Sequence, residues 1–243
     1  MLFPEAKELS ADQKAVIKRY KRIIFESIKL ICEKRGYHDL AVLVDEEYGR
    51  DIHEDCRDIG LRNILTTEKS GQKIFDFEYA DWKEHLRAVA PVYAKALIRV
   101  VMGEDHNLQN TRLKELQDFC ESIEMKLLIE PLIEPSVDDL AQCGSDKKHF
   151  DRELRPARFA EALNEMHAAG IAPHVWKIEG TQTKEAMDTC SKAVFSGGRP
   201  DTQIVILGRG ATMAEVSHWL TVGAKSNGVN GFAVGRTVFS DPI

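Results

Sequence analysis

The amino-acid sequence predicts an α/β fold of the TIM (β/α)8 barrel type. Short strand-like runs alternate with amphipathic helical segments along the chain of 243 residues, which is the pattern of parallel strands joined by crossover helices. Most of these runs carry few polar residues, as expected when helices cover a parallel sheet. No linker or composition break divides the chain. We therefore expect a single barrel domain over residues 1–243, in preference to a doubly wound sheet or two small domains.

The expected elements follow in regular order. A long helix is predicted at residues 11–35, and amphipathic helices at 110–124, 155–170 and 212–227. Thr212 and Glu215 form a capping box at the start of the last of these, and Gly228 lies beyond its end. The strand-like runs cover residues 39–49, 63–71, 93–101, 125–135, 174–180, 202–210 and 231–239.

The strand count is one short of a complete barrel. Seven runs are found, no strand precedes the first helix, and no room is left for a helix after the last strand. We therefore expect a barrel that lacks the first strand and the last helix. The opening would lie between the second and eighth strands of the full pattern, where two apolar edges need cover. Another subunit, and thus a homo-oligomer, or residues 1–10 would supply that cover.

Charge and composition narrow the class of protein. A net charge of −6, spread along the chain, argues against nucleic acid or an anionic membrane as the main partner. No apolar run approaches the roughly 20 residues of a membrane span, and the first residues lack the order of a signal peptide. The five cysteines are scattered, which favours reduced thiols in a cytoplasmic protein, with neither disulfides nor a metal site.

Alternation within the strands places charged side chains inside the barrel. In residues 93–101 the period of two directs the alanines and Ile98 towards the helices and Lys95 and Arg99 towards the interior. The same alternation in other runs directs inward Asp45, Glu130, Lys177 and Glu179. Charges in such an interior are costly unless they are paired or used.

The combination of lysines and carboxylates indicates amine chemistry. Considered alone, Lys177 is more readily a salt-bridged structural residue, and Glu130 a partner for Lys95 or Arg99. Considered together, burial and a cationic neighbour such as Lys95 or Arg99 would lower the pKa of Lys177. That supplies the neutral amine that a Schiff base requires, and a carboxyl group such as Glu130 can move the proton.

Two glycine–arginine sequences suggest an anion site. The last two runs contain Gly208-Arg209-Gly210 and Gly235-Arg236. Short glycine motifs are weak signals on their own and are usually turns. The loops after the seventh and eighth strands of such barrels, however, often bind phosphate through backbone N–H groups and a helix N-terminus. We therefore expect these residues to bind phosphate.

Several segments resemble class I aldolases of the tagatose-bisphosphate aldolase type. They are VLVDEEYG, EKSG, AKALIR, LIEPLIEP, VWKIEG and FAVGRT, in that order. DRELRP, VWKIEG, LGRGA and GFAVGRTVF, followed by DP after one residue, are more similar still to the aldolase-like domain fused to 5-dehydro-2-deoxygluconokinase in inositol catabolism. The resemblance covers essentially the whole chain.

The resemblance implies roles for individual residues. Lys177 would be the Schiff-base lysine and Glu130 the acid/base carboxylate. Lys95 would help to hold substrate or phosphate, and Arg236 would lie at the phosphate site with the backbone of Gly208 and Gly235. Either Glu68 or Lys69 of the EKSG segment would face the substrate, and alternation leaves that choice open. Asp45, Arg99 and Glu179 are further candidates for substrate contact.

The implied activity is cleavage of a phosphorylated keto sugar or keto acid, without a metal or organic cofactor. The inositol-pathway relative implies 2-deoxy-5-keto-gluconate 6-phosphate as substrate, with dihydroxyacetone phosphate and malonate semialdehyde as products. Two departures stand out: no opening strand ends in Asp-His-Arg or Asp-Gln-Arg, and residues 100–102 read Val-Val-Met where relatives tend to read Tyr-Asn-Pro. The alternative is a trimmed, inactive barrel that binds a phosphorylated metabolite or a partner protein.

Overall fold

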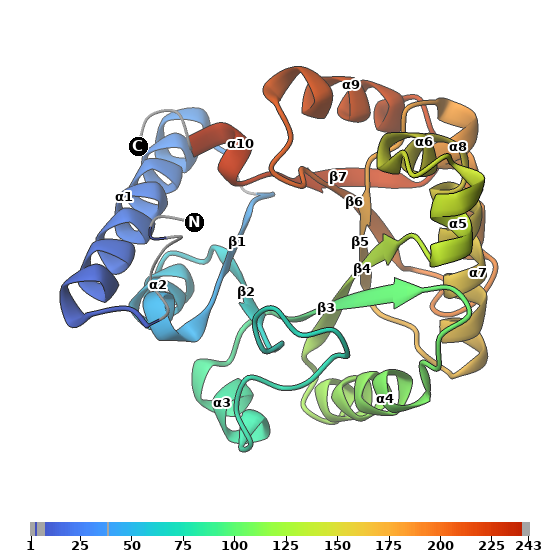
Figure 1. The fold of residues 1–243 in the computed structure, drawn as a ribbon. Helices are drawn as coiled ribbons and strands as arrows, with labels where there is room; N and C mark the ends of the chain where they lie inside the picture. The colour runs from blue at the N-terminus through green and yellow to red at the C-terminus, as the bar shows by residue number, and fades with distance from the viewer. Residues whose placement is uncertain (1–2, 4–7, 38, 240–243) are drawn as a thin grey trace. The chain divides into compact units, whose positions relative to one another are not determined.

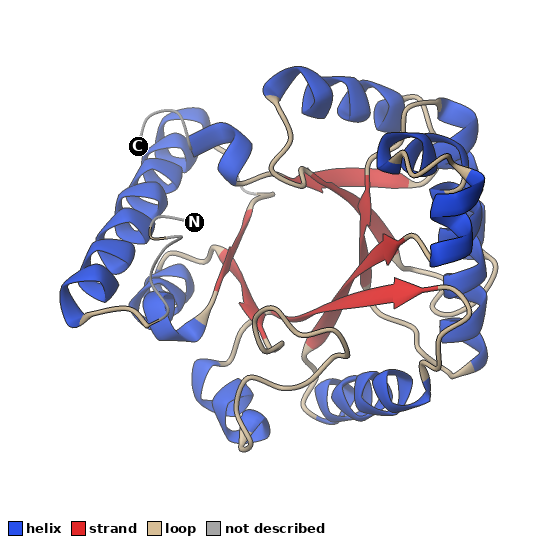
Figure 2. Ribbon diagram, in the orientation of Figure 1, coloured by secondary structure: helices blue, strands red, loops and turns tan. Residues whose placement is uncertain are grey.

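The computed structural model describes residues 3, 8–37 and 39–239 (Figure 1). Its contacts group the chain into two compact units: Met1–Thr67 with Tyr79–Ala94, and Glu68–Glu78 with Lys95–Ile243. Strands alternate with helices along the chain in both units (Figure 2). None of the helices within the described ranges is long and apolar enough to cross a membrane, and all five cysteines are free thiols.

Within its described residues, the first unit contains one parallel strand pair and three helices. Its elements are α1 (Ala11–Arg35), β1 (Ala41–Val44), α2 (Glu46–Asp58), β2 (Arg62–Thr66) and α3 (Trp82–Val89). β1 pairs with β2 in parallel, with Ala41 opposite Arg62. Val42 and Val44 pack with Phe25 of α1 and with Ile52 of α2. Alternate residues of β1 therefore face the helices, as the period of two requires.

The second unit contains the remaining strands, which are neighbours in chain order from β3 to β7. The pairs β4–β5, β5–β6 and β6–β7 are parallel. Its elements are β3 (Tyr93–Val101, whose first two residues belong to the first unit), α4 (Asn107–Ser122), β4 (Lys126–Glu134), α5 (Val137–Gln142), α6 (Lys147–Glu153), α7 (Arg155–Ala168), β5 (Val175–Glu179), α8 (Lys184–Phe195), β6 (Gln203–Leu207), α9 (Met213–Ala224), β7 (Val229–Ala233) and α10 (Arg236–Phe239).

The core of the second unit follows the predicted alternation. Ala96, Ile98 and Val100 of β3 are at most 3% exposed, and Trp176 and Ile178 of β5 are 1% exposed. Burial of these apolar side chains is the main stabilising contribution that the sheet makes. It also leaves the residues between them, including Lys95 and Lys177, on the opposite face of their strands.

Helix ends were predicted more accurately than strand ends. α1 spans the predicted residues, and the capping box of Thr212 and Glu215 opens α9 as expected. The strand expected at residues 39–49 was wrong beyond Val44, because the Asp45 side chain accepts a hydrogen bond from Tyr48 N and starts α2. The last run was wrong beyond Ala233, since residues 236–239 form the short helix α10.

The opening expected between the outermost strands stays a prediction, as does the single domain. Residues 1–2 and 4–7 of the proposed N-terminal cover lie outside the described residues, as do Asp241 and Pro242 of the last similarity segment.

Candidate active site

Three neighbouring strands of the second unit bring two lysines to one carboxylate oxygen. Lys177 Nζ of β5 lies 3.0 Å from Glu130 Oε2 of β4. Lys95 Nζ of β3 lies 3.0 Å from the same oxygen. The register that sets Ile129 opposite Trp176 places the next residues, Glu130 and Lys177, side by side. On its other side Lys95 forms an ion pair with Glu68 Oε1.

Glu68, Lys95, Glu130 and Lys177 form a row of contacting charges. Because these side chains are largely buried, the protonation state of each depends on the charges of its neighbours. The side chains of Lys95, Glu130 and Lys177 are 4%, 8% and 13% exposed. Burial lowers the pKa of Lys177; Glu130 opposes this and Lys95 reinforces it, so the pKa lies below that of an ordinary lysine. Burial also disfavours charge on Lys95, but Glu68 and Glu130 outweigh it and raise the pKa of that amine. Lys177 is therefore the amine that loses its proton more easily.

Glu130 is held as a carboxylate in the same row. Burial acts to raise its pKa, but the positive charges of Lys95 and Lys177 outweigh burial, and the net pKa is lowered. An amine able to become neutral thus lies next to an ionised carboxylate, out of bulk water. Such a pair can deliver a nucleophile and then accept or return a proton.

The structure distinguishes Glu68 from Lys69 in the EKSG segment. Glu68 turns to Lys95, whereas Lys69 is exposed and its backbone N–H bonds to Asp76 O. Residues 68–78 form an excursion closed by an antiparallel bridge between Glu68 and Phe77. Sequence alternation could not resolve this choice because the segment leaves the sheet after Thr66.

A second ionic cluster lies at the end of β5. Glu179 is 3% exposed, and its Oε1 lies 2.8 Å from Arg209 Nη1. Its Oε2 accepts from Ile133 N and lies 3.6 Å from Arg155 Nη1. Asp151 of α6 contacts both arginines. Burial raises the pKa of Glu179 more than the two arginines lower it, so this carboxylate depends on both cations to stay ionised.

The loop after β6 carries the predicted anion residues. Arg209 and Gly210 both have positive φ, 50° and 70°, and the second of these favours glycine. The Arg236 guanidinium lies against Gly210: a Cβ placed there would come within 3.1 Å of it. Thr237 Oγ1 donates to Ala211 O at 2.8 Å, which ties the start of α10 to this loop.

The two arginines of this region differ in their partners. Arg209 is held by two carboxylates, whereas exposed Arg236 has no ion pair with any carboxylate in the described part of the chain. Arg236 is thus the better placed of the two to meet an anion. Gly208 begins this loop, and its N–H donates a hydrogen bond to Ala233 O. Gly235 immediately precedes α10.

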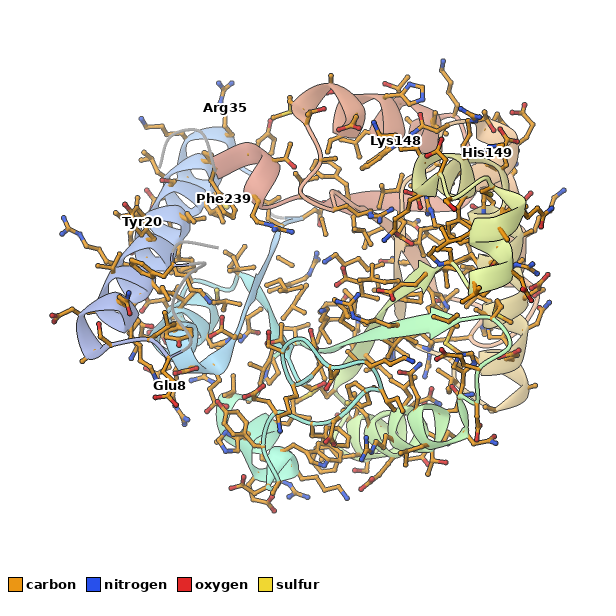
Figure 3. The ribbon with its side chains drawn as sticks, viewed as in Figure 1. Glu8, Tyr20, Arg35, Lys148, His149 and Phe239 are labelled. Atoms are coloured by element: carbon orange, nitrogen blue, oxygen red, sulfur yellow. The ribbon has the colours of Figure 1, made fainter. Side chains whose placement is uncertain are left out.

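Figure 3 labels two further polar side chains on α6, Lys148 and His149. Both are exposed. The pKa of Glu215 is lowered by hydrogen bonds from Thr212 and, to a smaller extent, by the charge of Lys148. α6 therefore brings a lysine towards the start of α9, which sequence reasoning missed because nothing in the spacing of residues 147–153 indicates that proximity.

Two predicted residues are engaged elsewhere. Asp45, in the first unit, caps α2 and forms an ion pair with Lys21. Arg99 pairs with Glu134 and is about one-third exposed. Lys95, and not Arg99, is the cation that acts on Lys177.

Other polar groups of the second unit do not extend this site. A surface depression is lined by the start of α4 and by Glu165 of α7, and it contains none of the predicted residues. No group of three or more His, Cys, Asp or Glu side chains is arranged to hold a metal ion over the ranges that the structure describes.

Solved structures with the same fold include Schiff-base aldolases. An archaeal fructose-1,6-bisphosphate aldolase, with its catalytic lysine covalently bound to the carbinolamine intermediate of the substrate, has a TM-score of 0.61 at 16% identity, covering 91% of this chain and 80% of the other. Another structure of an archaeal fructose 1,6-bisphosphate aldolase has 0.57 at 16%, covering 88% and 76%. A study of reaction intermediates of a Schiff-base-forming fructose-1,6-bisphosphate aldolase gives 0.54 at 15%, covering 81% and 71%. At these identities the similarity shows the fold, and the predicted fold class is confirmed.

The sequence comparison adds a family. The family model described as "Uncharacterized protein conserved in bacteria (DUF2090)" matches residues 2–243. No curated protein matches the sequence.

Proposed function

The chain belongs to this bacterial DUF2090 family, and from that premise we propose that it is a class I aldolase that cleaves a phosphorylated keto sugar or keto acid. The observation that carries the proposal is the buried contact of 3.0 Å between Lys177 Nζ and Glu130 Oε2. The fold of Schiff-base aldolases supports it. Lys177 would be the nucleophile, Glu130 the acid/base and Lys95 the cation that favours the neutral amine.

In the proposed reaction, neutral Lys177 Nζ attacks the carbonyl carbon of the ketone, and a proton moves from the nitrogen to the carbonyl oxygen to give a carbinolamine. Return of the proton that Lys177 gave up when it became neutral, with loss of water, then gives an iminium ion. The hydroxyl group beyond the scissile bond passes its proton to Glu130, the carbon–carbon bond breaks, and its electron pair moves to the iminium to form an enamine. An aldehyde leaves. Return of the proton to the enamine carbon, followed by hydrolysis, releases the second product and restores the amine.

The pKa of Glu130 changes during this reaction. While Lys177 is an ammonium ion, two cations hold the Glu130 pKa down. While the ketone is bound as an iminium ion, both positive charges are present and Glu130 is an ionised carboxylate that can take the proton of the hydroxyl group. As the carbon–carbon bond breaks, the iminium becomes a neutral enamine, one of those cations is lost, and the pKa of Glu130 rises as it takes up the proton.

The proposed substrate carries a phosphate group. The neighbours named above act on fructose 1,6-bisphosphate, and Arg236 lies over the turn at Gly210 without a carboxylate partner among the described residues. Phosphate held there would supply binding energy at a distance from the reacting carbon. Within this class we propose 2-deoxy-5-keto-gluconate 6-phosphate, giving dihydroxyacetone phosphate and malonate semialdehyde, on the strength of the segments DRELRP, LGRGA and GFAVGRTVF.

Reductive trapping tests the proposed nucleophile. Incubation with dihydroxyacetone phosphate and borohydride should reduce the iminium to a stable secondary amine, and peptide mass mapping should find it on Lys177. Lys177→Ala should form no adduct. A protein that traps no ketone, or traps it equally after that substitution, would contradict the proposed chemistry. In that case, retained binding of the phosphorylated ketone would favour an inactive barrel that binds a phosphorylated metabolite.

Arg236→Ala tests the proposed phosphate contact. A charge-assisted hydrogen bond contributes about 1.5–3 kcal/mol, so affinity for a phosphorylated ketone should fall roughly 10- to 100-fold. Affinity for the unphosphorylated analogue should change little. Isothermal titration of both ligands measures this difference, with Arg152→Ala as control because Arg152 is exposed and pairs with its neighbour Glu153. Equal losses for both ligands would show that Arg236 does not read the phosphate.

A further inference from the structure

One carboxylate oxygen of Glu68 is buried without a hydrogen bond. Its Oε1 pairs with Lys95, and the side chain is 11% exposed. Its Oε2 is buried and meets no donor among the described residues. Buried acceptors of this kind are rare in native proteins, and each needs an explanation. Glu68 Oε2 therefore lacks a donor in the part of the chain that the structure describes, and a bound ligand can supply one.

The backbone that carries Glu68 is well fixed. The bridge to Phe77 closes the excursion, and Phe75 within it is fully buried. Gln109 of α4 accepts from Phe75 N at 3.0 Å, and Arg112 donates to Phe75 O at 2.7 Å. With Lys95 holding its other oxygen, Glu68 has little freedom to turn Oε2 towards a partner elsewhere. The ligand must come to it.

Glu68 belongs to the same row of charges as Lys177. The order of contacts is Glu68, Lys95, Glu130, Lys177, and the contacts of Glu130 with both lysines are 3.0 Å. The charge of Glu68 also acts on the pKa of Lys177. A small ligand attached to Lys177 therefore has only a short distance to reach Glu68.

The charge of the row selects a neutral donor. When Lys177 is an iminium ion, two positive groups face the two carboxylates Glu68 and Glu130, and the row is balanced. A further ammonium group on the ligand would add an unpaired charge in a buried place, which is costly. A hydroxyl group donates one hydrogen bond and brings no charge.

On the basis of the proposed function, we propose that Glu68 Oε2 accepts a hydrogen bond from a hydroxyl group on the carbon next to the ketone that Lys177 captures. Glu68 is then a specificity-determining residue, and the substrate class is α-hydroxy ketones in preference to their deoxy analogues. Sites that hydrogen-bond a substrate hydroxyl reject analogues that lack it, because the acceptor is left unpaired.

Two ketones that differ only in this hydroxyl group test the inference. Dihydroxyacetone phosphate has it and hydroxyacetone phosphate lacks it. Borohydride trapping on Lys177 is measured as a function of the concentration of each ketone. In the unaltered protein, dihydroxyacetone phosphate should reach half-maximal trapping at a concentration at least 10-fold lower. This comparison needs no variant, so it does not depend on whether a substituted protein folds.

Glu68→Gln then assigns the preference to the carboxylate. Its amide oxygen is expected to face Lys95, so the NH2 group replaces the acceptor. The hydroxyl group must then accept from that NH2 group in a neutral hydrogen bond, which is weaker than one to a carboxylate, and the preference should fall at least about 3-fold. Any effect of the lost charge on Lys177 acts on both ketones alike and cancels in the ratio. Glu121→Gln, which loses a surface partner of Arg199, should keep the original ratio.

The outcomes separate this inference from the proposed function. Trapping of both ketones at equal concentration, or an unchanged preference in Glu68→Gln, would overturn the role of Glu68 and leave Lys177 as the nucleophile. In the first case Glu68 Oε2 binds only water. Trapping of neither ketone would overturn the proposed function, and the role of Glu68 with it.

Discussion

Glu130→Gln should still capture a ketone on Lys177, yet cleave it about 10²- to 10⁴-fold more slowly, which is the usual contribution of a positioned acid or base. The amide cannot take the proton of the leaving hydroxyl group, so the carbon–carbon bond lacks an acceptor when it breaks. The amine itself is intact. Single-turnover cleavage and borohydride trapping, measured on the same preparation, separate the two steps.

The pH dependence of trapping should shift in the same variant. Glu130 raises the pKa of Lys177, against the lowering by burial and by Lys95. Replacing the carboxylate by an amide removes the raising contribution, so the neutral amine persists to lower pH. The midpoint of the rise in trapping with pH should therefore move to lower pH. A shift to higher pH, or normal cleavage, would contradict the role given to Glu130. Glu134→Gln, on the same strand but paired with Arg99, should leave both measurements unchanged.

Arg155→Met should lower the free energy of unfolding by about 3–5 kcal/mol, the range seen when one partner of a buried ion pair is removed. Glu179 is 3% exposed and Arg155 is 5% exposed. Without Arg155, the carboxylate keeps only Arg209 as a cationic partner. Arg155 Nη2 also donates to Gly180 O at 2.8 Å, and this acceptor would be left unpaired. Urea unfolding at neutral pH measures the change.

The loss should shrink as the pH falls. The pKa of Glu179 is already raised in the folded protein, and removal of a cation raises it further. Protonation of Glu179 in the folded variant then offsets part of the lost free energy of unfolding. This offset grows as the pH falls towards the ordinary pKa of a glutamate. Arg152→Met is the control: its side chain is 55% exposed and pairs with exposed Glu153, and we expect about 1 kcal/mol or less. Equal destabilisation by both substitutions would show that burial of Arg155 is not the cause.

Strand alternation was enough to predict that these charged side chains share one face of the sheet. A period of two places Lys95, Glu130 and Lys177 on the same face of their strands, and the parallel register brings them together. Alternation depends only on local geometry, so it can be read from single strands. It also predicted the buried face of β3.

The differences between the predicted and the observed structure arise from contacts between residues that are distant in the sequence. Arg209 was expected at a phosphate, but Glu179 and Asp151 hold it, and these lie 30 and 58 positions away in the sequence. Glu68 could not be separated from Lys69, since the excursion is positioned by packing against α4. β1 ends early because one side chain, Asp45, caps the next helix. None of these contacts leaves a periodic pattern or a motif in the sequence, so none of them could be predicted from it.

The charged groups that act on the Lys177 pKa are Glu130, Lys95 and Glu68, and all three belong to the same compact unit as the lysine. Burial lowers the pKa of this amine most, and the further tuning by charge comes from these three positions, two of them on strands adjacent in the sheet. Over evolutionary time, substitutions at exposed positions that leave this burial intact can accumulate without retuning this amine. Purifying selection for reactivity should fall on those three positions, while neutral drift is tolerated at exposed positions without a charged contact to them. Sequencing of functional variants from a random library would show this as a sharp difference in tolerance between the two sets of positions.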